Sequence, residues 1–234
     1  ITFAPGETSK IITVAVLDDN VFENPESMYV NLLNPTNSTI ADAQGEGRIL
    51  DNADKPSLSV STTEVVEGGY AVFNIQLSNP STEDVTFDLT PKEGTATQDD
   101  YSSIVEVSYD GGVTWTPASE ATIPAGKTQI LARVQTTQDD IDELVEKFTL
   151  TADITSGNTT NVSSTGTASI LDNDGEPQIV ISDSSVNEED GLLTFVVSLS
   201  NPSSNEVTVN YVTADGTAIS GSDYVSSTGT ITFA

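Results

Sequence analysis

The sequence predicts an all-β chain in which antiparallel β-sandwiches follow one another, one of them complete and two partial. The first observation is a repeat: ILDNADKP at 49–56 returns as ILDNDGEP at 170–177, and the ITFA at 1–4 returns at 231–234. The second is a regular alternation of apolar and polar residues, with no helical period over about ten residues or more. Short alternating strands separated by turn residues are typical of sandwiches, and the repeat indicates tandem copies.

The predicted strands follow from this alternation, taken in chain order. In the first partial unit, Ile12 and Val14 match Ala132 and Val134 of the complete unit, and Met28 and Val30 match Phe148 and Leu150. The complete unit has apolar residues at every second position over 71–77, 85–89, 132–134 and 148–150, and the last unit repeats this over 193–199 and 207–211. Side chains of a strand point alternately to opposite faces, so each run predicts one buried face.

The repeat also predicts the domain boundaries. Residues 56–175 form one complete unit, residues 1–55 are the C-terminal part of a preceding unit, and residues 176–234 are the N-terminal part of a following one. The junctions at 52–56 and 173–177 each end on a proline and are too short for flexible linkers. We therefore expect neighbouring units to lie end to end with limited freedom.

The composition is strongly acidic: 36 Asp and Glu oppose 7 Lys and Arg, which gives a net charge of −29. Such a charge can serve solubility alone, but here the carboxylates gather in loops, which favours metal binding. Without a basic surface we expect no nucleic-acid partner, and no apolar run predicts membrane insertion. The chain has no cysteine and no histidine, which excludes disulfides, thiol catalysis and histidine-based zinc or copper sites. We expect no enzymatic activity.

The acidic residues occupy matched positions in the units. A glutamate follows the first strand, and an aspartate precedes a tyrosine in the loops GTATQDDY at 94–101 and GTAISGSDY at 216–224. Further acids follow a later strand, and others close each unit. In chain order the candidate metal ligands are Asp18, Asp19, Glu23, Glu26, Asp51, Glu67, Asp100, Asp139, Asp140, Glu143, Glu146, Asp172, Asp174, Glu188 and Asp223.

In a sandwich, alternate connections emerge at the same end, so these loops can converge on one tip. Two unit charges about 5 Å apart repel by about 3 kcal/mol at an effective dielectric constant of about 20, so such a cluster calls for a cation. Oxygen ligands in excess, without nitrogen or sulfur, favour Ca²⁺, which accepts six to eight oxygens in irregular loops. The sequence therefore predicts calcium as the cofactor.

The chain resembles the Calx-beta domain family over nearly its whole length. The resemblance rests on Val65-x-Glu67, on the two GTA…DY loops, on the run from Val14 to Glu26, and on the closing ILDND at 170–174. It implies immunoglobulin-like β-sandwiches that bind calcium through loops at the end next to the following domain. Carried over residue by residue, the family's ligands fall on Glu67, Asp100, Asp139, Asp140, Glu143, Glu146, Asp172 and Asp174. Gln138 stands where the first unit has Asp18, which leaves the register of the aspartate pair open by one residue.

Residues 102–121 form an insertion that the last unit lacks. The stretch Ser108 to Trp115 resembles an Asp-box, a structural hairpin in which Asp110 accepts backbone N–H groups and Gly111–Gly112 take positive φ. We expect Trp115 to pack over this hairpin. Its alternative role is an exposed platform for a sugar.

The leading functional hypothesis is a calcium-rigidified spacer segment of an extracellular repeat adhesin, secreted by a bacterium, which holds a distal binding domain away from the cell surface. One alternative is a calcium sensor that regulates a partner. The other is a carbohydrate-binding module that uses the 102–121 hairpin. Glycans or surfaces contacted by other parts of the parent protein are candidate partners.

The two partial units are complementary, because the last unit supplies the strands that the first lacks. Strand faces such as Ile12 and Val14, or Leu193 and Phe195, would be exposed in an isolated chain. Exposed strand edges recruit missing strands. We therefore expect neighbouring Calx-beta repeats as partners and head-to-tail self-association through the half-domains.

Overall fold

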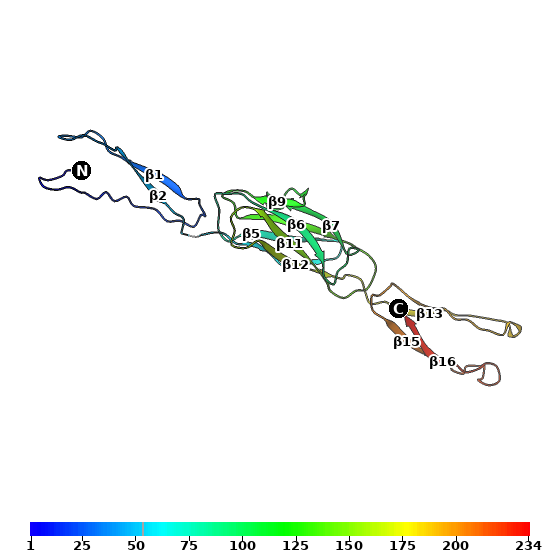
Figure 1. The fold of residues 1–234 in the computed structure, drawn as a ribbon. Helices are drawn as coiled ribbons and strands as arrows, with labels where there is room; N and C mark the ends of the chain where they lie inside the picture. The colour runs from blue at the N-terminus through cyan, green and yellow to red at the C-terminus, as the bar shows by residue number, and fades with distance from the viewer. Residues whose placement is uncertain (53) are drawn as a thin grey trace.

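The computed structural model describes residues 1–52 and 54–234. The molecule is elongated, with a two-layered sandwich (the central domain, residues 56–175) between an N-terminal segment (residues 1–52) and a C-terminal segment (residues 176–234) (Figure 1). The predicted all-β class is confirmed: in the described residues the only helical element is one 3₁₀ turn, η1 (Glu188–Asp190). In the same residues, no helix is long and apolar enough to cross a membrane.

The central domain consists of two five-stranded sheets. One sheet has the strand order β3-β5-β10-β7-β8 and the other β4-β12-β11-β6-β9. The strands of the first sheet are β3 (Leu58–Val60), β5 (Tyr70–Leu77), β7 (Tyr101–Ser108), β8 (Thr116–Pro117) and β10 (Gln129–Thr136). Those of the second are β4 (Thr63–Val66), β6 (Val85–Glu93), β9 (Glu120–Ile123), β11 (Glu146–Ser156) and β12 (Ser163–Leu171).

The core lies between the two sheets, on the faces that the alternation predicts. In β5 the residues Ala71, Phe73, Ile75 and Leu77 are all buried, as are the matching apolar residues of β6, β10 and β11. Phe148 lies at the centre, with the ring of Tyr101 stacked on it at 4.2 Å and Phe73 against it edge-on at 6.1 Å. Truncating a buried aromatic residue of this kind costs about 3–5 kcal/mol, so these rings hold the sheets together.

β4 switches the chain from one sheet to the other. β3 pairs antiparallel with β5, whereas β4, which follows it at once, pairs in parallel with β12, with Val66 opposite Leu171. In a parallel pair the carboxyl ends of both strands lie at the same edge. The residues that follow β4 and β12 are therefore neighbours, which places the acids after each strand together.

The two end segments contain fewer paired strands. In the N-terminal segment β1 (Glu26–Asn31) pairs with β2 (Gln44–Ile49). In the C-terminal segment β13 (Ile179–Ile181) pairs with β14 (Val197–Leu199), and β15 (Val207–Val212) with β16 (Thr228–Phe233). All three pairs are antiparallel, and each is an isolated two-stranded sheet.

The hairpin at 108–116 has the predicted Asp-box contacts. Asp110 Oδ1 accepts the N–H groups of Val113 and Thr114 at 3.0 and 2.9 Å, and Gly111 and Gly112 have φ of 75° and 94°. The hydroxyl group and then the N–H of Thr114, followed by the Ser108 hydroxyl and the N–H of Val113, lower the pKa of Asp110 to about 2. The carboxylate fixes the turn.

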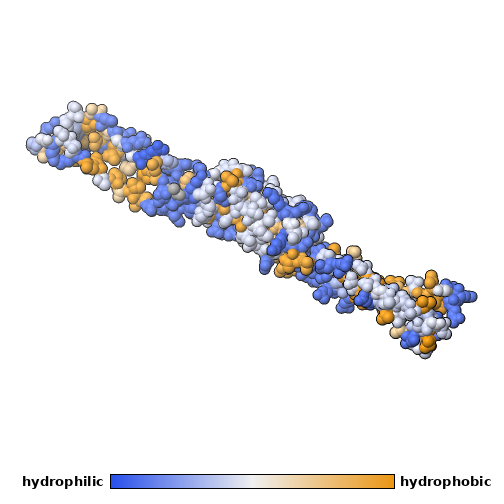
Figure 2. Space-filling model, turned by 60° about the horizontal axis from the view of Figure 1, so that its bottom comes forward, coloured by the Kyte–Doolittle hydropathy of each residue, from blue (hydrophilic) through white to orange (hydrophobic). Residues whose placement is uncertain are grey.

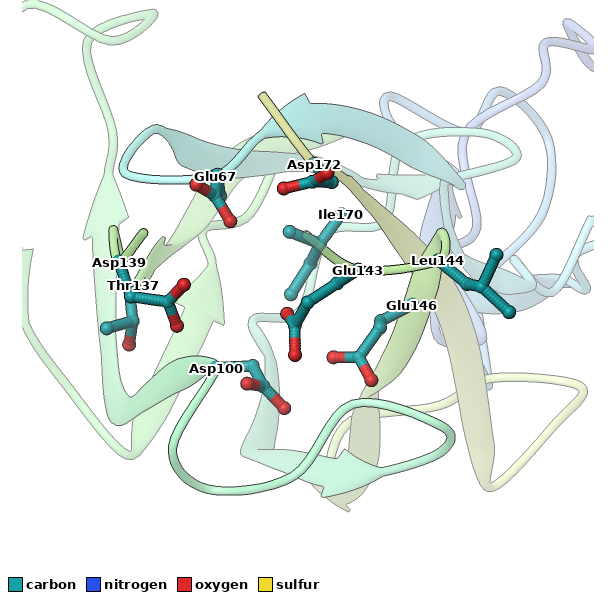
Figure 3. Close-up of a pocket in the computed structure, with 9 residues that line it drawn as sticks. All are labelled: Glu67, Asp100, Thr137, Asp139, Glu143, Leu144, Glu146, Ile170 and Asp172. Carbon is teal, nitrogen blue, oxygen red and sulfur yellow. The ribbon is translucent and has the colours of Figure 1, made fainter. Parts of the chain in front are cut away.

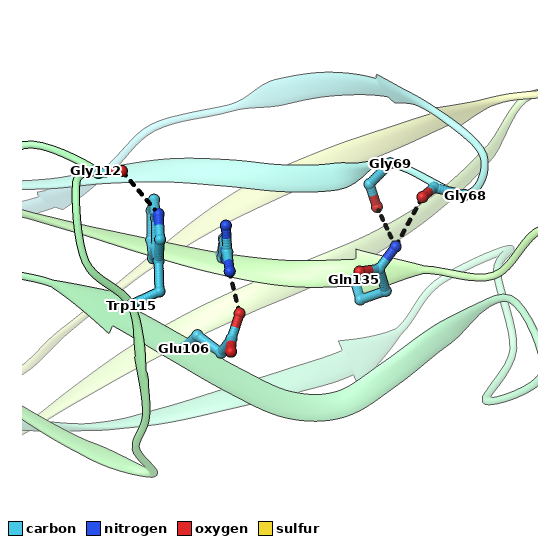
Figure 4. A network of polar contacts seen from close by, with 7 residues as sticks. Gly68, Gly69, Glu106, Gly112, Trp115 and Gln135 are labelled. Atoms are coloured by element: carbon cyan, nitrogen blue, oxygen red, sulfur yellow. Dashed lines mark hydrogen bonds and ion pairs between the residues drawn. The ribbon is translucent and has the colours of Figure 1, made fainter.

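Trp115 is held against the sheet. Its indole N–H donates to the Gly112 carbonyl at 3.0 Å (Figure 4). The Arg133 guanidinium lies between the rings of Trp115 and Tyr70, 4.3 and 3.8 Å from their centroids, and donates to Glu106 at 2.7 Å. Such cation–π contacts are worth about 0.5–1 kcal/mol each at exposed sites. They attach the inserted hairpin to β5 and β10.

Candidate metal centre

Six candidate metal ligands of the central domain lie at one end of the sandwich, around a small hollow (Figure 3). Glu67 follows β4, and its N–H donates to the carbonyl of Leu171 at the end of β12, directly before Asp172. β10 ends at the same tip, while β7 and β11 begin there. The hollow is lined by Glu67, Asp100, Thr137, Asp139, Glu143, Leu144, Glu146, Ile170 and Asp172.

Two groups of three carboxylates form within this tip. Glu67, Asp139 and Asp174 make the first, and one oxygen from each lies within 4.8 Å of the others. The second consists of Asp100, Glu143 and Glu146, to which the same limit applies. Segments far apart in the chain thus meet, as expected from a sandwich in which these loops share an end.

The first group is the more buried. Glu67 is only 7% exposed, and Oδ2 of Asp174 is buried without a hydrogen-bond partner among the described residues. Burial, followed by the neighbouring carboxyl groups of Asp174, Asp139 and Asp172, raises the pKa of Glu67 from 4.5 to about 7. A buried carboxylate without a donor is costly, so this group calls for a proton or a cation.

The second group has the same electrostatic character. Burial, and then the carboxyl group of Asp100 beside it, raises the pKa of Glu146 from 4.5 to about 7. Burial and the charges of Asp100 and Asp139 also raise the pKa of Glu143. No lysine or arginine lies among the residues that line the hollow, so no side-chain cation of the described residues there offsets these charges.

Local backbone turns hold the aspartates in place. Asp139 Oδ1 accepts the N–H of Ile141 at 2.7 Å, and Asp172 Oδ1 accepts that of Asp174 at 3.1 Å. Asp100 Oδ2 accepts the N–H of Thr97 at 2.6 Å, within the GTATQDDY loop. An aspartate that accepts from a nearby N–H makes a tight turn, which leaves its second oxygen free for another ligand.

Two amide side chains belong to this tip, although the sequence did not single them out as site residues. Gln138 Nε2 donates to Glu67 Oε1 at 2.6 Å, and its Oε1 accepts from Asn173 Nδ2 at 3.1 Å. Gly68, with φ of 73°, permits this approach, since a Cβ there would lie 2.8 Å from the Gln138 oxygen. The asparagine shared by both closing motifs, at 52 and 173, was the available sequence signal.

The structure settles the register of the aspartate pair. In the N-terminal segment Asp19 Oδ1 accepts the N–H of Val21 at 2.8 Å, the same turn that Asp139 makes. Asn52 Nδ2 donates to Asp18 Oδ1 at 2.7 Å, in the place of the contact between Asn173 and Gln138. Asp19 therefore matches Asp139, and Asp18 matches Gln138.

Asp140 does not join either carboxylate group. It lines a larger hollow of about 620 Å³ at the junction with the C-terminal segment, together with Asp174, Gly175, Glu176, Gln178, Ser200, Asn201 and Pro202. Neighbouring residues of an extended chain point in opposite directions, so Asp139 and Asp140 face different surroundings.

The end segments carry parts of the same tip. The pKa of Glu23 is raised, first by the charge of Glu26 and then by burial and the charges of Asp19 and Asp51. These four acids therefore lie near one another in the N-terminal segment. In the C-terminal segment, Glu188 begins η1, and Asp223 Oδ2 accepts the N–H of Ile219 at 2.7 Å. That contact resembles the one between Asp100 and Thr97, with one more residue in the loop.

The donors at the central tip fit calcium. They are the carboxylate oxygens of the two groups, of which the first is more buried, together with the amide oxygens of Gln138 and Asn173. The chain has no histidine or cysteine, and its single methionine is its only sulfur-containing residue. Calcium accepts mixed carboxylate and carbonyl oxygens in irregular geometry, whereas Mg²⁺ requires a smaller octahedron. The buried, unpartnered Asp174 oxygen is the atom that such an ion would satisfy.

The chain matches a known domain family over most of its length. The family model of the Calx-beta domain matches residues 1–54, 51–176 and 172–234. The human FRAS1-related extracellular matrix protein 2 is 29% identical over 165 residues, which are 64% of this chain and 5% of that protein, so the chain spans a small part of this relative.

Solved structures with similarity to the chain include two from Calx. The apo-form Calx CBD1 domain has 15% sequence identity and a TM-score of 0.36, over 50% of this chain and 99% of that one. The CBD12 structure from CALX1.2 has 14% identity and a TM-score of 0.38, over 76% of this chain and 71% of that one.

Proposed function

The chain belongs to the Calx-beta family of calcium-binding domains, and we propose that it is a calcium-stiffened spacer segment of an extracellular repeat adhesin. The observation that carries this proposal is the pair of carboxylate groups at the tip next to the following unit. Glu67, Asp139 and Asp174 would hold one ion, and Asp100, Glu143 and Glu146 another. A bound cation removes the repulsion among these acids and orders the loops that carry them.

The contacts at the second junction, between the central domain and the C-terminal segment, support stiffening. The loop that carries candidate calcium ligands also contacts the next unit there. Asp142, between the candidate ligands Asp139 and Glu143, donates its N–H to the Pro202 carbonyl at 3.1 Å. Its own carbonyl accepts the N–H of Ser204 at 2.9 Å, and its carboxylate accepts the Ser203 hydroxyl at 2.8 Å. An ion that orders this loop would also fix the next unit.

The first junction has the same backbone contact. Phe22 stands at the position of Asp142, and its N–H donates to the Pro80 carbonyl at 2.9 Å. The N–H of Thr82 donates back to the Phe22 carbonyl at 2.9 Å. Phe22 and Asp142 have different side chains but make the same main-chain hydrogen bonds to the neighbouring unit. The main chain therefore sets the position of one unit relative to the next. A repeated step is what a regular spacer needs.

An extracellular location is supported by the relative whose name includes extracellular matrix protein, and by the acidic composition without cysteine. A secreted repeat protein that lacks disulfides needs another stabilising element, and bound calcium supplies one. A bacterial surface as the setting, and a distal binding domain held away from the cell, complete the proposal.

A calcium sensor is the second candidate, and the Asp142 contact favours it. A loop that both binds the ion and touches the next unit can transmit binding as a change of angle. Affinity separates the two roles, since sensors bind in about the 10⁻⁷–10⁻⁵ M range and extracellular modules at about 10⁻⁴–10⁻³ M. A sugar site on the hairpin is not proposed, because Trp115 uses its N–H and a ring face within the domain.

Small-angle X-ray scattering tests the spacer directly. The monomer fraction from gel filtration is measured in CaCl₂ and in EGTA with equal MgCl₂. We expect a longer, narrower particle in calcium, and no such change for the variant Glu67→Gln/Glu146→Gln. Identical profiles in both buffers, for a chain that binds calcium by calorimetry, would contradict the stiffening role.

A further inference from the structure

The tetrapeptide Ser-Asn-Pro-Ser occurs at 78–81 in the central domain and again at 200–203 in the C-terminal segment. Each copy directly follows a strand, β5 or β14, and forms a turn that contacts the preceding unit. In the space-filling view hydrophilic surface (blue) is prominent at both ends of the central domain, toward the two end segments (Figure 2). Polar groups are therefore available at both junctions to hold one unit against the next.

At the second junction the asparagine of this turn reaches back to the linker between the units. Asn201 Nδ2 donates to the carbonyl of Gly175 at 2.8 Å. Gly175 directly follows Asp174, a member of the more buried carboxylate group. The linker is thus bound to the following unit one residue after it leaves the candidate metal centre.

The serine before this asparagine determines which way the amide points. Ser200 Oγ accepts the N–H of Gln178 at 2.9 Å, and its own hydroxyl group donates to Asn201 Oδ1 at 2.6 Å. Since Oδ1 is occupied as the acceptor, the amide NH₂ group is the one that faces the Gly175 carbonyl. The N–H of Ser200 also donates to the Gln178 carbonyl at 2.9 Å, which anchors the serine beside the start of β13.

The first junction repeats these contacts. Ser78 Oγ accepts the N–H of Ser57 at 3.0 Å and donates to Asn79 Oδ1 at 2.7 Å. Asn79 Nδ2 donates to the carbonyl of Asp54, the residue that matches Gly175 in the repeat. An aspartate and a glycine occupy the same acceptor position, so the asparagine recognises the main chain of the linker and not a side chain.

The proline of each turn supplies a second contact with the preceding unit. The carbonyl of Pro202 accepts the N–H of Asp142, and that of Pro80 accepts the N–H of Phe22. Because the asparagine and the proline are adjacent, one turn holds both the linker and the loop that carries candidate ligands. Contacts at two separate points restrict rotation between units more than either contact alone.

We propose that the Ser-Asn pair of each turn is a linker clamp, a pair of positioning residues that sets the angle between consecutive units. This inference deepens the proposed spacer function and rests on it. Calcium would order the loop that contacts the proline carbonyl, while the clamp holds the linker itself. The clamp contains no candidate metal ligand, so it acts with and without the ion.

Distances between two spin labels test the clamp, because the chain has no cysteine of its own. The labels are attached to Thr90→Cys on β6 and Thr208→Cys on β15, both at exposed positions. Double electron–electron resonance is recorded in CaCl₂ and in EGTA, with Asn201 unchanged and with Asn201→Ala. We expect the variant to widen the distance distribution about twofold in both buffers, because an unclamped linker samples more orientations. Calcium affinity by calorimetry should change by less than about twofold.

The matched control is Asn205→Ala, in the same turn. Asn205 is exposed, and its N–H donates to Ser203 Oγ, a contact that the substitution keeps. A distribution that is no wider in Asn201→Ala than in this control would overturn the proposal. So would a loss of calcium affinity of about tenfold, since it would place the Asn201 side chain in the metal site.

Asn79→Ala applies the same test to the first junction, with labels at Thr90→Cys and at Tyr29→Cys on β1. Here the turn belongs to the central domain, whose folding is followed by the fluorescence of Trp115, the single tryptophan of the chain. A wider distribution in a folded domain supports the clamp. A lower melting temperature without widening would make the asparagine merely structural and overturn the proposal.

The spacer function and the clamp are judged by different comparisons. With Asn201 and Asn79 unchanged, equal distributions in CaCl₂ and in EGTA would contradict stiffening by calcium. The comparison of Asn201→Ala with Asn205→Ala decides on the clamp in either buffer.

Discussion

Gln138 donates a hydrogen bond of 2.6 Å from Nε2 to Oε1 of Glu67, at the position where the preceding unit has Asp18. The neutral amide satisfies one oxygen of a nearly buried carboxylate without adding a charge to a tip that already holds two carboxylate groups. This contact stabilises the ion-free tip, and it lowers the number of charged ligands available to calcium.

Gln138→Asp should therefore make the central domain more dependent on calcium. The added carboxylate removes a donor from Glu67 and increases the repulsion, so the melting temperature in EGTA should fall. Calcium affinity should rise, because affinity increases with the number of charged ligands. Gln129→Asp, at the opposite end of β10, makes the same charge change and should alter neither quantity in thermal scans and calorimetric titrations.

The two neighbouring aspartates should differ in effect. Asp139 shares a carboxylate group with Glu67 and Asp174, so Asp139→Asn should weaken calcium binding about tenfold or more, which corresponds to about 1.4 kcal/mol. Asp140 faces the junction, so Asp140→Asn should change affinity by much less. Calorimetric titration of both variants checks this order, and equal losses would show that Asp140 is also a ligand.

The ion-free tip should make stability depend on pH. The pKa values of Glu67 and Glu146 are raised from 4.5 to about 7, so the folded chain holds protons that the unfolded chain has released. Stability in EGTA should therefore fall as pH rises from about 4.5 to about 7. Calcium competes with these protons, so its affinity should increase over the same range. A melting temperature in EGTA that rises steadily through this window would contradict the assignment.

The hairpin should be independent of the metal centre. Asp110→Ala removes the acceptor of the N–H groups of Val113 and Thr114 and should lower the stability measured by chemical denaturation. Calcium affinity should stay the same as in the unchanged chain. A parallel loss of affinity would mean that the hairpin and the acidic tip are coupled through β7.

Much of this fold could be predicted because the alternation of apolar residues fixes which face of each strand is buried. The run from Ala71 to Leu77 gives the inner face of β5 without any further information. The convergence of Glu67 with Asp172 could also be expected, since loops at one end of a sandwich meet. Which of the adjacent residues Asp139 and Asp140 faces the tip depends on a single backbone turn, in which Asp139 accepts the N–H of Ile141. Two neighbouring aspartates in a loop cannot be told apart in this respect from the sequence.

The central claim is that the acidic tip binds calcium, and thermal unfolding with and without the ion tests it most directly. A ligand that binds only the folded state stabilises it by about 2.7 kcal/mol at about 100 times its Kd. At low salt we predict a melting temperature that rises with calcium concentration, less so with equal magnesium, and that fails to rise in Glu67→Gln/Glu146→Gln. A melting temperature that is the same in calcium and in EGTA would contradict the account.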